Sequence, residues 1–283
     1  MENGAESILN CNSIKLADLP DFGEVEKLHS ATAPSSAAYE LIHGHCVVIS
    51  TIAWQIAHHC NMLLSAENRA AQMSETLRKR AEIAKNCLQE LVGDSYAILP
   101  ALSGGLAPKQ YIDEYAALIG GLLHDIGTYF VLESDGSSNA GGILRFDGPN
   151  YILHGLRGYK YLIDNGFSED AAQFARNHTG VGLTREQVIA QNLSLPAEDY
   201  IPQTVEQEIV MVADKYNSKS IPPRFLTVDS YRRKAARFGE DNANRWMQLV
   251  AKYGEPDIAG LAEIFNMRAV SYTHLTLPTN REV

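Results

Sequence analysis

A histidine and an aspartate follow a long apolar segment of the chain. Residues 115–123 read Tyr-Ala-Ala-Leu-Ile-Gly-Gly-Leu-Leu, and His124, Asp125, Ile126 and Gly127 come next. Such a run is typical of a buried helix, and a glycine just beyond it is a common stop because it accepts the left-handed conformation. We therefore expect His124 and Asp125 in the last turn of a buried helix. Buried polar groups must be paired or bound to metal, and this pair alone fits either a backbone-bonded helix end or a metal site.

Four more residues of metal-ligand type lie on the apolar faces of expected helices: His45, His154, His178 and Asp214. Each alone has an ordinary structural explanation, since a lone histidine on an apolar face is usually a satisfied core residue. Six imidazole and carboxylate groups directed at one interior are hard to satisfy without metal. Nitrogen and oxygen ligands without cysteine suit divalent iron, manganese, cobalt, nickel or zinc, and facing helices can build a two-metal centre.

Helices must position these groups, because strand patterns are scarce. His45 belongs to a stripe that repeats every three or four residues, as the buried face of a helix does. Helices are expected over residues 37 to beyond 57, 61–92, 111–124, 151–165, 168–178, 185–191, 206–217, 230–251 and 258–265. Residues 1–31 are expected to be loop-like, and 130–150 an ordered loop or small β-hairpin. The predicted fold is all-α, one helical bundle with peripheral helices and this insertion.

Composition narrows the class of protein. The 283 residues are 45% hydrophobic and carry a formal net charge of −10, which disfavours broad binding to nucleic acid or to an anionic membrane. The sequence has no membrane-length apolar stretch, and because its start is acidic and polar we do not expect a secretory signal there. Its four cysteines have no CxxC spacing, so reduced thiols in the cytoplasm are expected.

The pattern as a whole resembles a known family. It consists of His45 with Ile49 and Ala53 downstream, the segment 124–127, and Asp214 after an apolar run. This pattern resembles the HD-domain superfamily of metal-dependent phosphohydrolases over roughly residues 35–220. The segment Asn-His-Thr-Gly-Val-Gly-Leu-Thr at 177–184 and the Pro-Pro-Arg-Phe of 222–225 further resemble an uncharacterised HDIG-type branch.

The resemblance implies a ligand assignment and an activity. A first divalent ion would bind His45, His124, Asp125 and Asp214, and a second would bind Asp125, His154 and His178, with Asp125 bridging. A hydroxide bridging the two ions would be the nucleophile, which makes His124 and Asp125 catalytic. The substrate implied is a small phosphoester, of the nucleotide kind.

One departure concerns the substrate. Many HDIG proteins have lysine directly after the glycine, but Thr128 stands there in this chain. Arg157, Lys215 and Arg233 are candidates to contact phosphate instead. Arg233 belongs to a basic cluster at 232–237 that equally suits a solvated helix face.

Two alternative functions use the same residues. Enzymes resembling inositol oxygenase hold two irons with the same ligand set and react with O₂. A regulatory module would keep the fold and bind metal without turnover.

The expected organisation has four parts: an N-terminal extension over 1–34, the HD domain over 35–220, a helical extension packed on it over 221–268, and a tail over 269–283. Residues 270–279 resemble translated sequencing-adapter text. The tail is therefore expected to be non-native and is set apart from fold reasoning.

Overall fold

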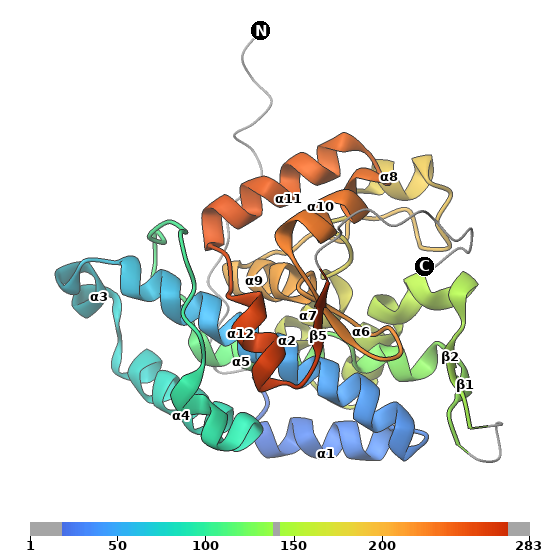
Figure 1. The fold of residues 1–283 in the computed structure, drawn as a ribbon, viewed down its shortest axis with the longest axis horizontal. Coiled ribbons are helices and arrows are strands. Elements are labelled where there is room, and N and C mark those ends of the chain that lie inside the picture. Colours follow the sequence, from blue (N-terminus) through green and yellow to red (C-terminus); the bar gives the residue numbers. More distant parts are fainter. Residues whose placement is uncertain (1–18, 138–141, 271–283) are drawn as a thin grey trace, which may run out of the picture.

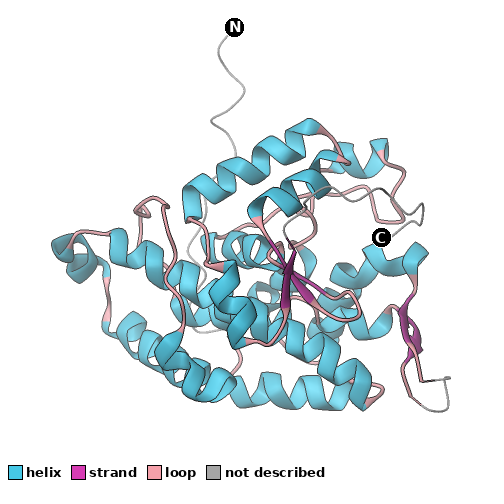
Figure 2. Ribbon diagram, viewed as in Figure 1, coloured by secondary structure: helices cyan, strands magenta, loops and turns pink. Residues whose placement is uncertain are grey.

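A computed structural model describes residues 19–137 and 142–270, and nearly all its regular structure is helical (Figures 1 and 2). The α-helices are α1 (Phe22–Thr32), α2 (Ser36–Leu63), α3 (Ala66–Gln72), α4 (Glu75–Val92), α5 (Glu114–Leu123), α6 (His154–Asp164), α7 (Glu169–Arg176), α8 (Arg185–Ala190), α9 (Val205–Asp214), α10 (Val228–Ala236), α11 (Glu240–Tyr253) and α12 (Ile258–Ile264). The 3₁₀ helices are η1 (Gly93–Ile98), η2 (Ile126–Phe130) and η4 (Gly148–Leu153). The all-α prediction is confirmed.

Strands are short and form two small sheets. β1 (Leu132–Asp135) and β2 (Leu144–Phe146) make an antiparallel hairpin, as one of the two options for 130–150 predicted. β3 (Asn217–Ser218) pairs antiparallel with β4 (Arg224–Leu226), and β4 pairs parallel with β5 (Arg268–Val270). This three-stranded sheet was not predicted. Of the expected tail, residues 269 and 270 belong to β5, and residues 271–283 lie outside the described residues.

Helices α2 and α5 form the centre of the molecule (Figure 1), and two glycines let α5 pack closely on α2 and on α7. A Cβ on Gly121 would lie 2.5 Å from the Cα of Ser50 in α2. A Cβ on Gly120 would lie 2.2 Å from the ring of Phe174 in α7. The Ser50 hydroxyl donates to the carbonyl of Leu118 at 2.6 Å and links α2 to α5. The position of α5, which leads into His124, is therefore set by contacts on two sides.

Buried apolar side chains form two large clusters, and α2 and α5 contribute to both. One cluster joins them to α9–α12, with Trp246 fully buried. The other joins them to α1, α4 and α7, with Val25 and Leu88 fully buried. Burial of this kind contributes about 25 cal/mol per Å² of apolar surface. The helices that carry the six polar residues are thus fixed by the main core.

Three local predictions were wrong. Residues 22–32 form α1, which begins with a capping box between Asp21 and Glu24. The helix expected over 230–251 is two helices, because the chain turns at Gly239 with a φ of 118°. The buried helix ends at Leu123, so His124 caps it and Asp125 precedes η2.

No single helix in the described ranges is long and apolar enough to cross a membrane; α2 and α3 meet that condition only when counted together across a bend of 117°.

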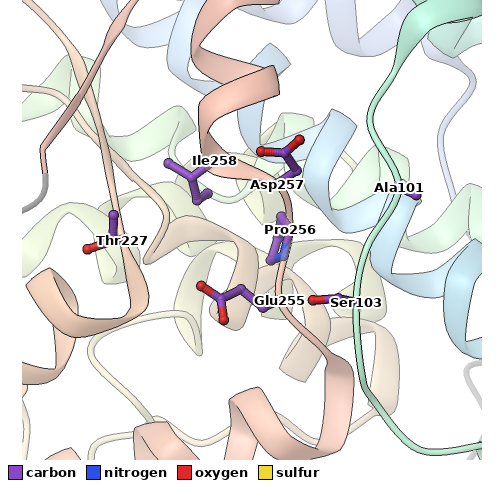
Figure 3. A pocket seen from close by; sticks show the side chains of 7 residues that line it. All are labelled: Ala101, Ser103, Thr227, Glu255, Pro256, Asp257 and Ile258. Atoms are coloured by element: carbon purple, nitrogen blue, oxygen red, sulfur yellow. The ribbon is translucent and has the colours of Figure 1, made fainter.

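A surface hollow of about 300 Å³ is lined by Ala101, Ser103, Thr227, Glu255, Pro256, Asp257 and Ile258 (Figure 3). None of the six polar residues lines this hollow.

Candidate metal centre

The six predicted ligands lie together in the interior, in two groups that share one residue. The first group is His45, His124, Asp125 and Asp214, and the second is Asp125, His154 and His178. Within each group, one ligand atom per residue lies within 4.8 Å of all the others. These residues come from α2, the α5–η2 junction, α6, the segment after α7, and α9. Helices far apart in sequence thus bring their polar groups to one place.

The Asp125 carboxylate lies between the two groups. Its Oδ2 is 3.2 Å from Nε2 of His45 and 3.4 Å from Nε2 of His124. Its Oδ1 is 3.5 Å from Nε2 of both His154 and His178. The side chain is fully buried. Each oxygen therefore faces a different set of nitrogen ligands.

Hydrogen bonds orient the four imidazoles so that Nε2 faces inward. Nδ1 donates to a carbonyl three residues earlier in His124 (2.7 Å, to Gly121), His154 (2.6 Å, to Tyr151) and His178 (2.8 Å, to Ala175). Nδ1 of His45 lies 2.9 Å from the amide oxygen of Asn217. Because an oxygen acceptor fixes the proton on Nδ1, the lone pair of each neutral ring lies on Nε2.

The second group passes a test of fit to a metal ion. Nε2 of His154 and Nε2 of His178 are 2.8 Å apart. Burial lowers the pKa of His154 to about 3 and also lowers the pKa of His178, so both rings are neutral near pH 7. Two unprotonated nitrogens cannot bond to each other, but a cation between them and Asp125 satisfies both.

The first group attracts positive charge. Burial opposes protonation of His124, yet the charge of Asp125 and hydrogen bonds with Asp125 and Asp214 raise its pKa well above the ordinary value. Burial likewise opposes ionisation of Asp125, but Lys219 and His124 hold the pKa of that carboxyl well below its usual range. The carboxylates of Asp125 and Asp214 would likewise attract a divalent ion placed here.

Glycine 127 has a different role from the one predicted. The helix ends before it, and Gly127 is not among the residues with positive φ. A Cβ there would lie 2.0 Å from the carbonyl oxygen of His154 and 2.3 Å from the nitrogen of Gly158. Gly127 therefore lets η2 pack directly on α6, which brings Asp125 and His154 together. Next to it, the hydroxyl of Thr128 donates to Oδ1 of Asp125 at 3.0 Å.

The three candidate phosphate contacts lie in different places. Lys215 is buried beside the centre, where its Nζ donates to Asp214 Oδ2 at 2.6 Å and to the carbonyl of His178 at 3.0 Å. Arg157 donates to the carbonyl of Phe130. Arg233 is exposed on α10. Among the contacts that the structure describes, Lys215 is the one of these three residues that touches any of the six candidate ligands.

Sequence reasoning missed Lys219. Its Nζ contacts Oδ2 of Asp125 and lies 3.3 Å from Nε2 of His45. It also missed Lys234, whose pKa is lowered by burial and by the charges of Lys215 and Lys219. Lys219 lies in a loop that no periodic pattern places, whereas Lys234 belongs to the basic cluster at 232–237.

Comparison with known proteins agrees with this geometry. A family model described as "HD domain" matches residues 100–218, a range that holds all of the six except His45. The chain is 36% identical over 143 residues to "Uncharacterized protein MJ0778" of Methanocaldococcus jannaschii, covering 48% of this chain and 72% of the relative.

Two other relatives are named "tRNA (cytidine(56)-2'-O)-methyltransferase". The one from Picrophilus torridus is 32% identical over 36% of this chain and 24% of its own length. The one from Thermoplasma volcanium is 29% identical over 52% of this chain and 37% of its own length. This chain thus spans well under half of either methyltransferase. No solved structure matches it significantly. From the family model and the extent of its likeness to the Methanocaldococcus protein, we conclude that the chain belongs to the HD-domain family, in an uncharacterised branch.

Proposed function

We propose that this protein is a phosphohydrolase that binds two divalent ions and acts on a small phosphoester, of the nucleotide kind. Membership of the HD-domain family indicates a metal-dependent hydrolase. The observation that carries the two-ion proposal is the Asp125 carboxylate, whose two oxygens face separate ligand sets. A carboxylate in this position suits a bridge between two ions.

The residues of the chain have distinct roles in this proposal. His45, His124, Asp214 and one oxygen of Asp125 would hold the first ion; His154, His178 and the other oxygen would hold the second. When bound, such ions lower the pKa of water and stabilise charge on phosphoryl oxygens. The Nδ1 bonds fix the ring orientations before binding, so the four imidazoles need little reorganisation.

Lys215 is a positioning residue in this scheme. Its two hydrogen bonds join Asp214, at the end of α9, to the backbone of His178, after α7. The ammonium thus holds one ligand from each group in place.

We also propose that the chain divides into the HD domain over 35–220 and the helical extension over 221–268.

Positive side chains near the centre favour an anionic substrate. Lys215, Lys219 and Lys234 lie close enough to influence one another's charge or that of Asp214, although the whole chain is acidic. A phosphoester uses such groups, whereas the neutral substrate of an oxygenase does not. The relatives named for methylation of a tRNA cytidine support the choice of a nucleotide.

The test is metal content combined with turnover. Protein purified without added metal would be assayed for bound ions by elemental analysis and EPR, then for phosphate or nucleotide release from a phosphoester panel with Mn²⁺, Co²⁺ or Zn²⁺. We expect about two ions per chain. Asp125→Asn should lose both ions and the activity. Asp164→Asn is the matched control, because Asp164 is an exposed partner of Lys160 on α6.

Two results would contradict the proposal. Wild-type turnover by Asp125→Asn would remove the bridging carboxylate from the mechanism. Oxygen uptake with a mixed-valent iron signal, and inertness toward every phosphoester, would instead support the oxygenase alternative.

A further inference from the structure

The ammonium of Lys219 lies against the first group of ligands. Lys219 belongs to the loop between β3 and β4, and its Nζ contacts Oδ2 of Asp125 and Nε2 of His45. These are atoms that the first divalent ion would use. An ammonium and a divalent ion repel each other and cannot share one carboxylate oxygen at contact distance. Binding of the ion therefore requires the Lys219 side chain to move.

The neighbouring Lys215 is not under the same constraint. It bonds to Asp214 Oδ2 and to the carbonyl of His178. The carbonyl is not a proposed metal ligand, and Oδ1 of Asp214 is the atom that faces His45 and His124. Lys215 thus keeps its partners when the ion binds. The Nζ of Lys219 contacts two proposed ligands of that ion, Asp125 and His45, and also lies 6.0 Å from the ring centroid of Tyr151, which is not a proposed ligand.

The most exposed part of the centre lies beside Lys219. The side chains of His124 and Asp125 are fully buried, but those of Lys219 and Asp214 are 10% and 14% exposed. Lys234 on α10 is near enough to Lys219 for their charges to interact. An anion that approaches the ions from this side meets Lys219 before it meets Asp125.

We propose that Lys219 is the residue that binds a phosphoryl group of the substrate, and that it leaves Asp125 when the first divalent ion binds. This inference rests on the proposed function. The four rotatable bonds of lysine let the ammonium turn toward the opening while the backbone stays in place. A phosphoryl group bound at the ions then supplies the negative partner that Asp125 no longer provides.

The experiment measures binding of Mn²⁺ and of inorganic phosphate separately. Free Mn²⁺ would be followed by EPR during titration of wild type, Lys219→Gln, Lys219→Arg and Lys160→Gln. Phosphate affinity would then be measured by calorimetry on the Mn²⁺-loaded proteins. Lys160 is an exposed lysine paired with Asp164 on α6, so its variant controls for the loss of one positive charge.

Opposite changes are expected in the two affinities. Lys219→Gln should bind Mn²⁺ several-fold more tightly, because a competing cation is gone, and phosphate at least about tenfold more weakly, because a charge-assisted hydrogen bond is lost. Lys219→Arg should retain most of the phosphate affinity. Lys160→Gln should match wild type.

The inference is overturned if Lys219→Gln binds phosphate within about twofold of wild type, or if its Mn²⁺ affinity falls while Lys219→Arg behaves normally. Because phosphate binding needs no turnover, this result is separate from the proposed activity. Hydrolysis by Lys219→Gln with unchanged KM would overturn this inference and leave the phosphohydrolase proposal standing. The predicted binding changes without hydrolysis of any phosphoester would support the role of Lys219 and count against that proposal.

Discussion

Replacing Gly127 with alanine tests how the two halves of the centre are held together. Gly127 lies in η2, two residues after Asp125, and packs on α6 at His154 and Gly158. An alanine Cβ would lie 2.0 Å from the His154 carbonyl oxygen, 2.3 Å from the Gly158 nitrogen and 2.7 Å from the Gly158 Cα. All three are backbone atoms, so rotation of a side chain cannot relieve the overlap. We expect η2 and α6 to separate.

The cost follows from the number and kind of contacts. Overpacking a core with one extra group typically costs about 1–3 kcal/mol. Three backbone contacts under 3.0 Å place Gly127→Ala at the upper end, at about 3 kcal/mol. For a domain of this size, that corresponds to a melting temperature lower by about 6–12 °C. Separation also moves Asp125 away from His154, so the second ion should be lost first.

Thermal unfolding in chelator, together with metal analysis before chelation, provides the assay. Gly44→Ala is the control, because a Cβ at Gly44 in α2 would meet nothing within 4 Å. Within a helix this change should stabilise by about 0.5–1 kcal/mol. The reasoning is refuted if Gly127→Ala melts within about 2 °C of wild type and keeps its full metal content.

Three other predictions concern stability. Glu208 is buried and bonds to Lys252 (2.5 Å), Arg245 (2.9 Å) and Tyr253 (2.6 Å), so Glu208→Ala should cost about 3 kcal/mol in a urea titration; a loss below about 1 kcal/mol would contradict this. Burial lowers the pKa of His29 to about 4 from 6.5. The unfolded chain therefore takes up this proton first, and about 3 kcal/mol of stability should be lost as pH falls from 6.5 to 4. His29→Gln should show a shallower dependence on pH, and an unchanged slope would assign the loss elsewhere. Removal of bound metal should lower stability by about 3 kcal/mol when the ion had been present at 100 times its Kd; a melting temperature insensitive to chelator would argue against a site in the folded state.

Helical periodicity was enough to find the six candidate ligands. His45 was recognisable because it shares a stripe with apolar residues, and Asp214 because it ends an apolar run. A polar residue on such a face must turn into the interior together with its neighbours. The helix bounds were less accurate at breaks such as Gly239. The capping box of Asp21 and Glu24 was a visible signal for α1 that sequence reasoning did not use.

Lys219 shows what such patterns cannot provide. Its position depends on a loop between β3 and β4, and β4 in turn pairs with β5, more than 40 residues later in the chain. A contact set by long-range pairing leaves no period in the local sequence. The basic cluster at 232–237 was recognised from the sequence, but Arg233 was selected from it instead of Lys234. Selecting the correct residue requires knowing which face of α10 lies nearest the metal centre.

The location of the histidines at helix ends explains how the centre is oriented. His124 caps α5, His154 caps η4 before it begins α6, and His178 comes just after α7. At a helix end, backbone carbonyls lack the partners that the next turn would supply. Here carbonyls three residues earlier accept Nδ1–H of each ring, which leaves Nε2 free and directed inward. His45 lies inside α2, where carbonyls are used by the helix, and it takes the side chain of Asn217 as its acceptor instead. The same backbone feature that ends these helices therefore sets the direction of three ligand atoms, and the fourth needs a side chain from β3 to do so.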